Sequence, residues 1–332
     1  MMFKNKYILI LTIFLILMII MPITNERFLN NKNTIHFLNK IEAVNVFDKN
    51  MDYHKLHDIE VYSRTNGRVE LDLTPEDRIQ ELKIIYHSKL NEFKKEEKDA
   101  IFELTKITTI PDVKWKFIKI NDGIDWNYPY TLADVIVLPT SKVESMVNAV
   151  KNKDRAMIKT HVNTLTHEFM HVLQRKYQGL FNIFYIKNWG FTKPTRILND
   201  EWVQKYWITN PDTIDENWLW DINQFKKDKK PEYIWTRFLI DPENYDQKIK
   251  IAIRVSKIKN GDYRVNLNNG KTVYKNLVFE KSFNKRFFNL GQIYHPNEIF
   301  ANFVADSHNL KFMYPKDYKE IHEFLNNILK LK

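Results

Sequence analysis

The sequence contains no cysteine and only 7 glycines among its 332 residues. Without cysteine, the chain can form no disulfide, no thiolate metal site and no cysteine nucleophile. It also contains no Asn-x-Ser/Thr sequence, which argues mildly against passage through a glycosylating secretory pathway. Apolar residues are plentiful, since 44% of the chain is hydrophobic and 14% is aromatic. A chain of this length and composition is expected to fold around one large core or two smaller ones.

The balance of charge is basic, with 51 lysine and arginine residues against 41 aspartate and glutamate residues and a net charge of +10. Such a charge can attract anionic membranes or nucleic acid. The lysines are spread along the whole chain instead of forming one block, so a solvated basic surface is expected. No nucleic-acid recognition motif accompanies them, and nucleic acid is not an expected partner.

The first 24 residues are expected to form a hydrophobic signal anchor. The sequence is apolar from Tyr7 to Met21 except for Thr12, a length near the lower limit for a membrane-spanning helix. No small-x-small cleavage site follows Met21, which favours a retained anchor over a cleaved signal peptide. We therefore expect a membrane protein with a single pass through residues 7–21, or a secreted protein if that segment is removed.

Residues 25–73 are expected to form a spacer and a β-hairpin. Apolar residues alternate with polar ones on both sides of Asn66-Gly67, a dipeptide that adopts the positive φ angles of a tight turn. Residues 74–178 should then form a helix and small sheet together with the active-site helix. Thr74 and Pro75 begin a helical stretch to about Thr108, and strands follow at 113–117 and 135–138. We take 135–138 as the sheet edge along which an extended peptide would bind.

The active-site helix begins near Asp154, has Gly179 as its C-terminal cap, and carries a His-Glu-x-x-His motif. His167 and His171 lie one turn apart on one face, so both imidazoles can reach one ion, while Glu168 can hold a metal-bound water. A chance match is expected only about 0.02 times in such a chain. Apolar residues form a separate stripe, which leaves a polar face with Thr160, Thr164, His167, His171 and Gln174.

A catalytic zinc ion normally has three protein ligands, so a third must come from elsewhere in the chain. A pattern with glycine and a third histidine soon after the motif is absent. Residues 294–306 read as a second helix with Pro296 in its first turn. Tyr294, just ahead of it, is a candidate for stabilising the oxyanion of a tetrahedral intermediate. The candidate third ligands in or beside this helix are His295, Glu298, Asp306 and His308.

The pair Asn297-Glu298 resembles the Asn-Glu motif of the gluzincins, which are zinc metallopeptidases with the zincin fold. The following sequence is similar to the tail of the catalytic domain of anthrax lethal factor. This resemblance implies that Glu298 is the third zinc ligand. It rests on Glu-x-Phe-Ala at 298–301, Ser307-His308, Pro315 and a last apolar-striped helix.

Two features depart from the gluzincin pattern. Residues 172–297 separate the two motifs, where gluzincins usually have a few tens of residues. Asn302 occupies the position at which many of them have an acidic residue that supports a histidine ligand. An asparagine can still accept a hydrogen bond from an imidazole N–H, although it raises the basicity of the ligand less than a carboxylate does.

Residues 179–290 are expected to form a Trp-rich insertion with a β-meander. The segment holds six of the eight tryptophans, and alternating apolar residues at 249–255 precede turn signals at Asn260-Gly261 and Asn269-Gly270. We expect the tryptophans to form a compact core instead of substrate subsites. Residues 291–332 would supply the third-ligand helix and a C-terminal helix.

The sequence therefore predicts an α+β fold, zincin-like, with a β-rich insertion between the two zinc-ligand helices. The predicted function is a membrane-tethered zinc endopeptidase with one catalytic Zn²⁺ and a protein or peptide substrate. His167, His171 and Glu298 would bind the metal, with Glu168 as the base. The alternative is a catalytically inactive, membrane-tethered binding protein on a peptidase-like fold. Glu168 argues for the enzyme, because a structural zinc site needs no base.

Overall fold

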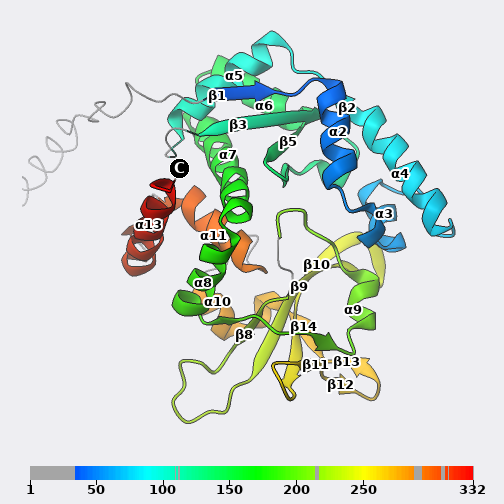
Figure 1. Ribbon diagram of the computed structural model, residues 1–332, viewed down its shortest axis with the longest axis vertical. Helices are drawn as coiled ribbons and strands as arrows, with labels where there is room; N and C mark the ends of the chain where they lie inside the picture. Colours follow the sequence, from blue (N-terminus) through cyan, green and yellow to red (C-terminus); the bar gives the residue numbers. More distant parts are fainter. Residues whose placement is uncertain are drawn as a thin grey trace, which may run out of the picture.

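Two sheets, at the top and bottom of the view in Figure 1, organise a mixed α+β fold, and the long helix α7 (Arg155–Lys176) runs from the first sheet towards the second. The computed structural model describes residues 34–108, 110, 113–213, 217–287, 294–307, 311–312 and 314–331. The predicted anchor at 7–21 lies outside these residues. Within the described part, no helix combines the length and apolar character needed to cross a membrane.

The first sheet has the strand order β1-β3-β5-β4, and β2 pairs with β3. β1, β3 and β5 are parallel, whereas β2 and β4 run antiparallel to their neighbours. The strand predicted at 113–117 is β3, and the one predicted at 135–138 is β5. The bounds are β1 Thr34–Phe37, β2 Leu90–Asn91, β3 Lys114–Ile120, β4 Tyr130–Leu132 and β5 Val135–Pro139.

β5 is buried on both faces, which explains why it is a continuous apolar run. Its side chains alternate between two cores. Ile136 and Leu138 belong to the large core around α7, and Val135 and Val137 belong to a second core beneath α2 (Lys40–Asn50) and α4 (Pro75–Lys89). The predicted sheet edge at 135–138 is therefore wrong: β5 lies between β3 and β4, and β4 is the edge strand.

Helices surround the first sheet. The predicted hairpin is wrong, because residues 58–64 form helix α3 with Ile59 and Val61 buried, and Asn66-Gly67 makes the turn after it with φ of 53° and 73°. The predicted helix to Thr108 is two helices, separated where Leu90 pairs with Ile120. The bounds are α2 Lys40–Asn50, η2 Tyr53–Lys55, α3 Asp58–Arg64, α4 Pro75–Lys89, α5 Lys95–Ile107, η3 Asp125–Asn127 and α6 Thr140–Lys151.

The motif helix α7 (Arg155–Lys176) begins as predicted, with the Asp154 side chain accepting hydrogen bonds from the N–H groups of Ala156 and Met157. Its end differs from the prediction. α8 (Gln178–Trp189) follows directly after Tyr177, so Gly179 lies inside the next helix and caps nothing.

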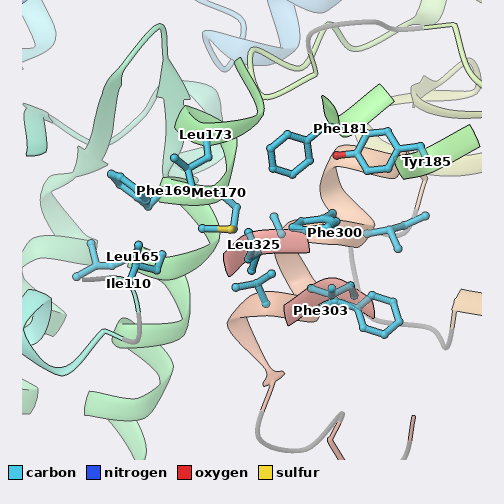
Figure 2. Packing of buried hydrophobic residues seen from close by; sticks show 14 of the residues in the cluster. Ile110, Leu165, Phe169, Met170, Leu173, Phe181, Tyr185, Phe300, Phe303 and Leu325 are labelled. Atoms are coloured by element: carbon cyan, nitrogen blue, oxygen red, sulfur yellow. The ribbon is translucent and has the colours of Figure 1, made fainter. Parts of the chain in front are cut away.

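The second helix expected to bear a ligand is α11 (Pro296–Ala305), and α13 (Pro315–Leu329) ends the described chain. Figure 2 shows Phe300 of α11 between residues of α7, α8 and α13. Its ring lies 5.0 Å from that of Phe181 in an edge-to-face arrangement, a geometry that adds to the gain from burial. Ala301 is fully buried, and such a small side chain lets α11 approach α7 closely.

The insertion forms the second sheet, with the strand order β6-β8-β9-β10-β11-β7 and β14 paired with β10, and a separate two-stranded sheet of β12 and β13. Asn260-Gly261 and Asn269-Gly270 make turns with positive φ, as predicted. Most of its tryptophans lie in the core: residues 189, 218, 220 and 235 are each at most 2% exposed. The bounds are β6 Phe191–Thr192, β7 Ile197–Leu198, α9 Glu201–Tyr206, β8 Leu219–Asp221, β9 Tyr233–Asp241, β10 Asn244–Lys257, β11 Tyr263–Val265, β12 Leu267–Asn268, β13 Lys271–Thr272, β14 Tyr274–Asn276, η4 Leu277–Phe279 and α10 Lys281–Phe287.

Candidate metal centre

The antiparallel contact of α7 with α11 brings together three of the predicted site residues. The Nε2 atoms of His167 and His171 lie 3.0 Å apart. Oε2 of Glu298 lies 3.3 Å from the first of these nitrogens and 3.8 Å from the second. His171 and Glu298 are buried, and the His167 side chain is 16% exposed. The three donors therefore converge on one point that remains open on the His167 side.

The spacing of the donors suits a zinc ion. Zinc bonds of about 2.0–2.1 Å at tetrahedral angles place ligand atoms about 3.4 Å apart, and the three measured separations lie on either side of that value. Two imidazole nitrogens and one carboxylate oxygen are also a ligand set that zinc favours in catalytic sites. A second group of possible donors, formed by Glu168, His171 and Asp212, adjoins the first.

Gln174 orients His171. Its Oε1 lies 2.7 Å from Nδ1 of His171, while its amide nitrogen donates to the carbonyl of Asn297 and to the hydroxyl of Tyr185. A carbonyl can only accept, so the amide group is oriented with its oxygen towards His171. Nδ1 of His171 must then carry the proton, and the Nε2 lone pair faces the donor cluster, as a metal ligand requires.

The protonation states of the cluster follow from burial and charge. Burial lowers the pKa of His171 to about 3, which keeps this imidazole neutral. Burial also disfavours a charge on His167, but the hydrogen bond and charge of Glu298 outweigh it and raise the His167 pKa to about 9. Although burial opposes it, the two histidines lower the pKa of Glu298. The carboxylate is thus ionised and attractive to a cation.

Glu168 lies beside the cluster and not in it. Its Oε2 accepts a hydrogen bond of 3.0 Å from the Thr131 hydroxyl of β4, which fixes the carboxylate against the edge strand. Burial is the main cause of a raised Glu168 pKa, and the nearby Glu298 contributes to it. A carboxylate whose pKa is raised towards neutrality can both accept and return a proton.

The segment 207–213 of the insertion reaches into the site, which the sequence did not predict. The Asn210 side chain donates to Oε1 of Glu298 and to the Tyr294 hydroxyl, both at 2.6 Å. Its own oxygen accepts from the backbone N–H of Asp212, which fixes the amide orientation. Asn210 thus holds the second carboxylate oxygen of Glu298 and leaves Oε2 directed at the histidines.

Asp212 and Arg175 occupy the open edge of β4. The backbone N–H of Thr131 donates to Oδ1 of Asp212 at 2.7 Å, and its carbonyl accepts from the Arg175 guanidinium at 2.9 Å. In an antiparallel pair, alternate residues point their backbone groups outwards. Thr131, the middle residue of β4, is such a residue, because its N–H and its carbonyl bond to Asp212 and Arg175. A peptide cannot add to this edge without displacing these contacts.

Tyr294 is buried, and its hydroxyl accepts the hydrogen bond from Asn210. Burial raises the pKa of Tyr294 well above its usual value, so the phenol stays protonated. Because Asn210 donates to it, the phenolic O–H is directed elsewhere as a donor. Tyr294 also lines the cleft beside this cluster of candidate metal donors, a position compatible with its predicted role.

Of the other predicted ligands, His295 and Asp306 are described, and neither is brought to the cluster. Nδ1 of His295 accepts a hydrogen bond from the N–H of Asn297 and caps α11. Asp306 lines the cleft but is in neither group of possible metal donors. His308 lies outside the described residues. Asn302 donates a hydrogen bond to the backbone carbonyl of Glu298 in its own helix. The residue that contacts an imidazole nitrogen of a candidate ligand is instead Gln174, at His171.

The cluster lies in a cleft of about 430 Å³, a size that suits several side chains of a ligand. Its walls come from segments beside the first sheet, from the insertion, and from α7 and α11. One part is aromatic, with Trp126, Tyr128, Tyr130, Phe238 and Tyr294, and another is polar, with Thr160, Asn163, Thr164, Asn302 and Asp306.

Comparison with known proteins adds no assignment: no family model matches the chain, and neither the curated proteins nor the solved structures include a match.

Proposed function

We propose that this protein is a zinc-dependent endopeptidase with a zincin-like catalytic fold. The observation that carries the proposal is the convergence of His167, His171 and Glu298 on one point in an open cleft. A glutamate that is not a ligand lies directly beside them. The spacing of the histidines and the position of the glutamate on a following helix are those of the gluzincins, which the sequence resembles.

His167, His171 and Glu298 would hold the ion. A bound zinc ion would lower the pKa of a water molecule to about 7 and polarise the substrate carbonyl. Glu168 would take the proton of the attacking water and deliver it to the leaving amine. The Thr131 hydroxyl holds this carboxylate in place. Burial raises the pKa of Glu168 towards neutrality, which suits both the uptake and the release of the proton.

Tyr294 would donate its phenolic hydrogen to the carbonyl oxygen as negative charge develops there. The hydrogen bond that it accepts from Asn210 leaves that hydrogen available. A donor placed at the developing charge stabilises the transition state more than the ground state. The apolar segment at 7–21 would tether the enzyme to a membrane, with a protein or peptide as substrate.

One observation favours the alternative, an inactive binding protein on the same fold. The outward backbone groups of Thr131 are already bonded to Asp212 and Arg175, so the edge strand offers an extended peptide no free hydrogen bonds. The enzyme remains the better proposal, because a binding protein needs no base at Glu168 and Tyr294 lines the cleft beside Glu298.

The experiment is a measurement of bound zinc and of peptide cleavage on the full-length chain. We expect near-stoichiometric zinc in the wild type, its loss in Glu298→Ala, and zinc without cleavage in Glu168→Gln. Glu323→Ala is the matched control, because Glu323 is an exposed helical glutamate of α13. Full zinc in Glu298→Ala would contradict the ligand set. Zinc without cleavage of any member of a mixed peptide library would favour the binding protein.

A further inference from the structure

One end of the cleft combines aromatic rings with lysines. β4 runs antiparallel to β5, so the residues that precede β4 and those that follow β5 lie at the same end of the first sheet. The former include Trp126 and Tyr128, and the latter include Lys142 in the first turn of α6. All three line the cleft.

The insertion places another lysine against these two rings. The ammonium of Lys248, in β10, lies 4.2 Å from the centre of the Trp126 ring and 5.4 Å from that of Tyr128. Cation–π contacts of this kind hold an ammonium group without using its N–H donors. Trp126 is itself fixed, because its indole N–H donates to Ser63 and its backbone has a φ of 55°.

Two nearby arginines, Arg64 in the cleft lining and Arg175 beside it, form ion pairs, whereas among the described residues the two lysines do not. Arg64 pairs with Glu60 and Asp125, and Arg175 pairs with Asp212. Lys142 and Lys248 form no ion pair or hydrogen bond with the described part of the chain.

Both ammonium groups are partly withdrawn from water; the charge of Glu168 offsets part of this cost at Lys142, and no opposite charge of the described residues offsets it at Lys248. Each is half-buried, and desolvation lowers the pKa of Lys142 and that of Lys248, the latter to about 8. A partly buried cation without a partner is stabilised when a carboxylate joins it. The arrangement therefore favours a ligand that brings negative charge to this end of the cleft.

We propose that Lys142, Lys248, Trp126 and Tyr128 form a subsite for the acidic side chains of the substrate. The substrate class is then peptides with aspartate or glutamate on one side of the scissile bond. This assignment rests on the proposed peptidase function for its cleavage step. Its binding step can be measured independently, since it depends only on the cleft.

The experiment measures the affinity of fluorescent peptides by anisotropy for the full-length, metal-free wild-type protein, which keeps Glu168 beside Lys142, and for zinc-loaded Glu168→Gln. Peptide pairs differ only by Glu or Gln at each position within four residues of the centre. We expect the Glu peptide to bind on the order of tenfold more tightly at one or two adjacent positions, the effect of one hydrogen-bonded charge pair.

The preference should disappear when Lys142→Met and Lys248→Met are combined. It should reverse towards Lys-containing peptides when both residues are replaced by glutamate. Lys227→Met, a change at an exposed lysine of the β8–β9 loop outside the cleft lining, should leave it intact. Circular dichroism confirms that each variant is folded, and each single variant supplies a milder test.

The outcomes separate the two proposals. Equal affinity for Glu and Gln peptides at every position, or a preference that survives in the double Met variant, would overturn the subsite. A lysine-dependent preference in a protein whose wild type cleaves none of the bound peptides would support the subsite and contradict the peptidase.

Discussion

Replacement of Gln174 by methionine should weaken zinc binding through the geometry of His171. Methionine keeps the length of the side chain but neither accepts from Nδ1 of His171 nor donates to Asn297 and Tyr185. Loss of a group that orients a metal-ligating histidine costs about 10–100-fold in metal affinity. This corresponds to about 1.4–2.7 kcal/mol.

The same change should lower the stability of the metal-free protein. Three polar groups, on His171, Tyr185 and Asn297, lose a partner at a site where Gln174 is only 1% exposed. Each buried group left without a hydrogen bond costs about 1–3 kcal/mol. We therefore expect a loss of about 3 kcal/mol or more in the free energy of unfolding.

Gln174→Glu distinguishes the two effects. A carboxylate still accepts from Nδ1 of His171, so zinc affinity should be kept, but it cannot donate to the carbonyl of Asn297, so stability should fall. The assays are competition for zinc with a chromophoric chelator and urea unfolding of the metal-free protein. Gln80→Met, at an exposed position of α4, is the control. A folded Gln174→Met protein with wild-type zinc affinity would refute this account of His171.

Three further predictions concern catalysis, stability and pH. Tyr294→Phe should lower kcat by about 10²–10³-fold, as loss of one oxyanion donor does, with zinc content unchanged; an unaltered kcat would exclude that role. Arg64→Met leaves the buried carboxylates of Glu60 and Asp125 unpaired and should reduce the free energy of unfolding by about 3–5 kcal/mol in urea titrations; a loss below 1 kcal/mol would contradict this. The ratio of kcat/KM for acidic over neutral peptides should fall as pH rises through about 8, because Lys248, destabilised as a cation by burial and by Arg64, loses its charge there; a pH-independent ratio would exclude Lys248.

The sequence predicted those parts of the site that depend on local spacing. Two histidines four residues apart on a helix must share a face. The apolar residues of the same helix recur at helical spacing, which predicted correctly that its other face packs against the core. Gln174 was visible on the same polar face, although its role was not. The Asn-Gly pairs at Asn260 and Asn269 also predicted the two turns correctly, because an Asn-Gly pair strongly favours a tight turn.

The failures came where tertiary contacts outweigh local preference. The segment around Ile59 alternates like a strand, yet it is helical, because Glu60 and Arg64 pair one turn apart and Glu60 also accepts from Thr209 of the insertion. Nothing in the sequence near Asn210 indicates that it bonds to Glu298. The hydrogen bond from Asn210 to Glu298 depends on where a loop of the insertion lies in the folded protein. No sequence pattern indicates that position.

The order of synthesis gives the separation of the ligands a further consequence. His167 and His171 leave the ribosome well over a hundred residues before Glu298, and the loop with Asn210 emerges between them. At about 5–20 residues per second, the delay is on the order of ten seconds. Throughout that time the nascent chain holds two histidines but no third ligand and no Tyr294. A peptidase assembled in this order would become competent only when its C-terminal helices dock.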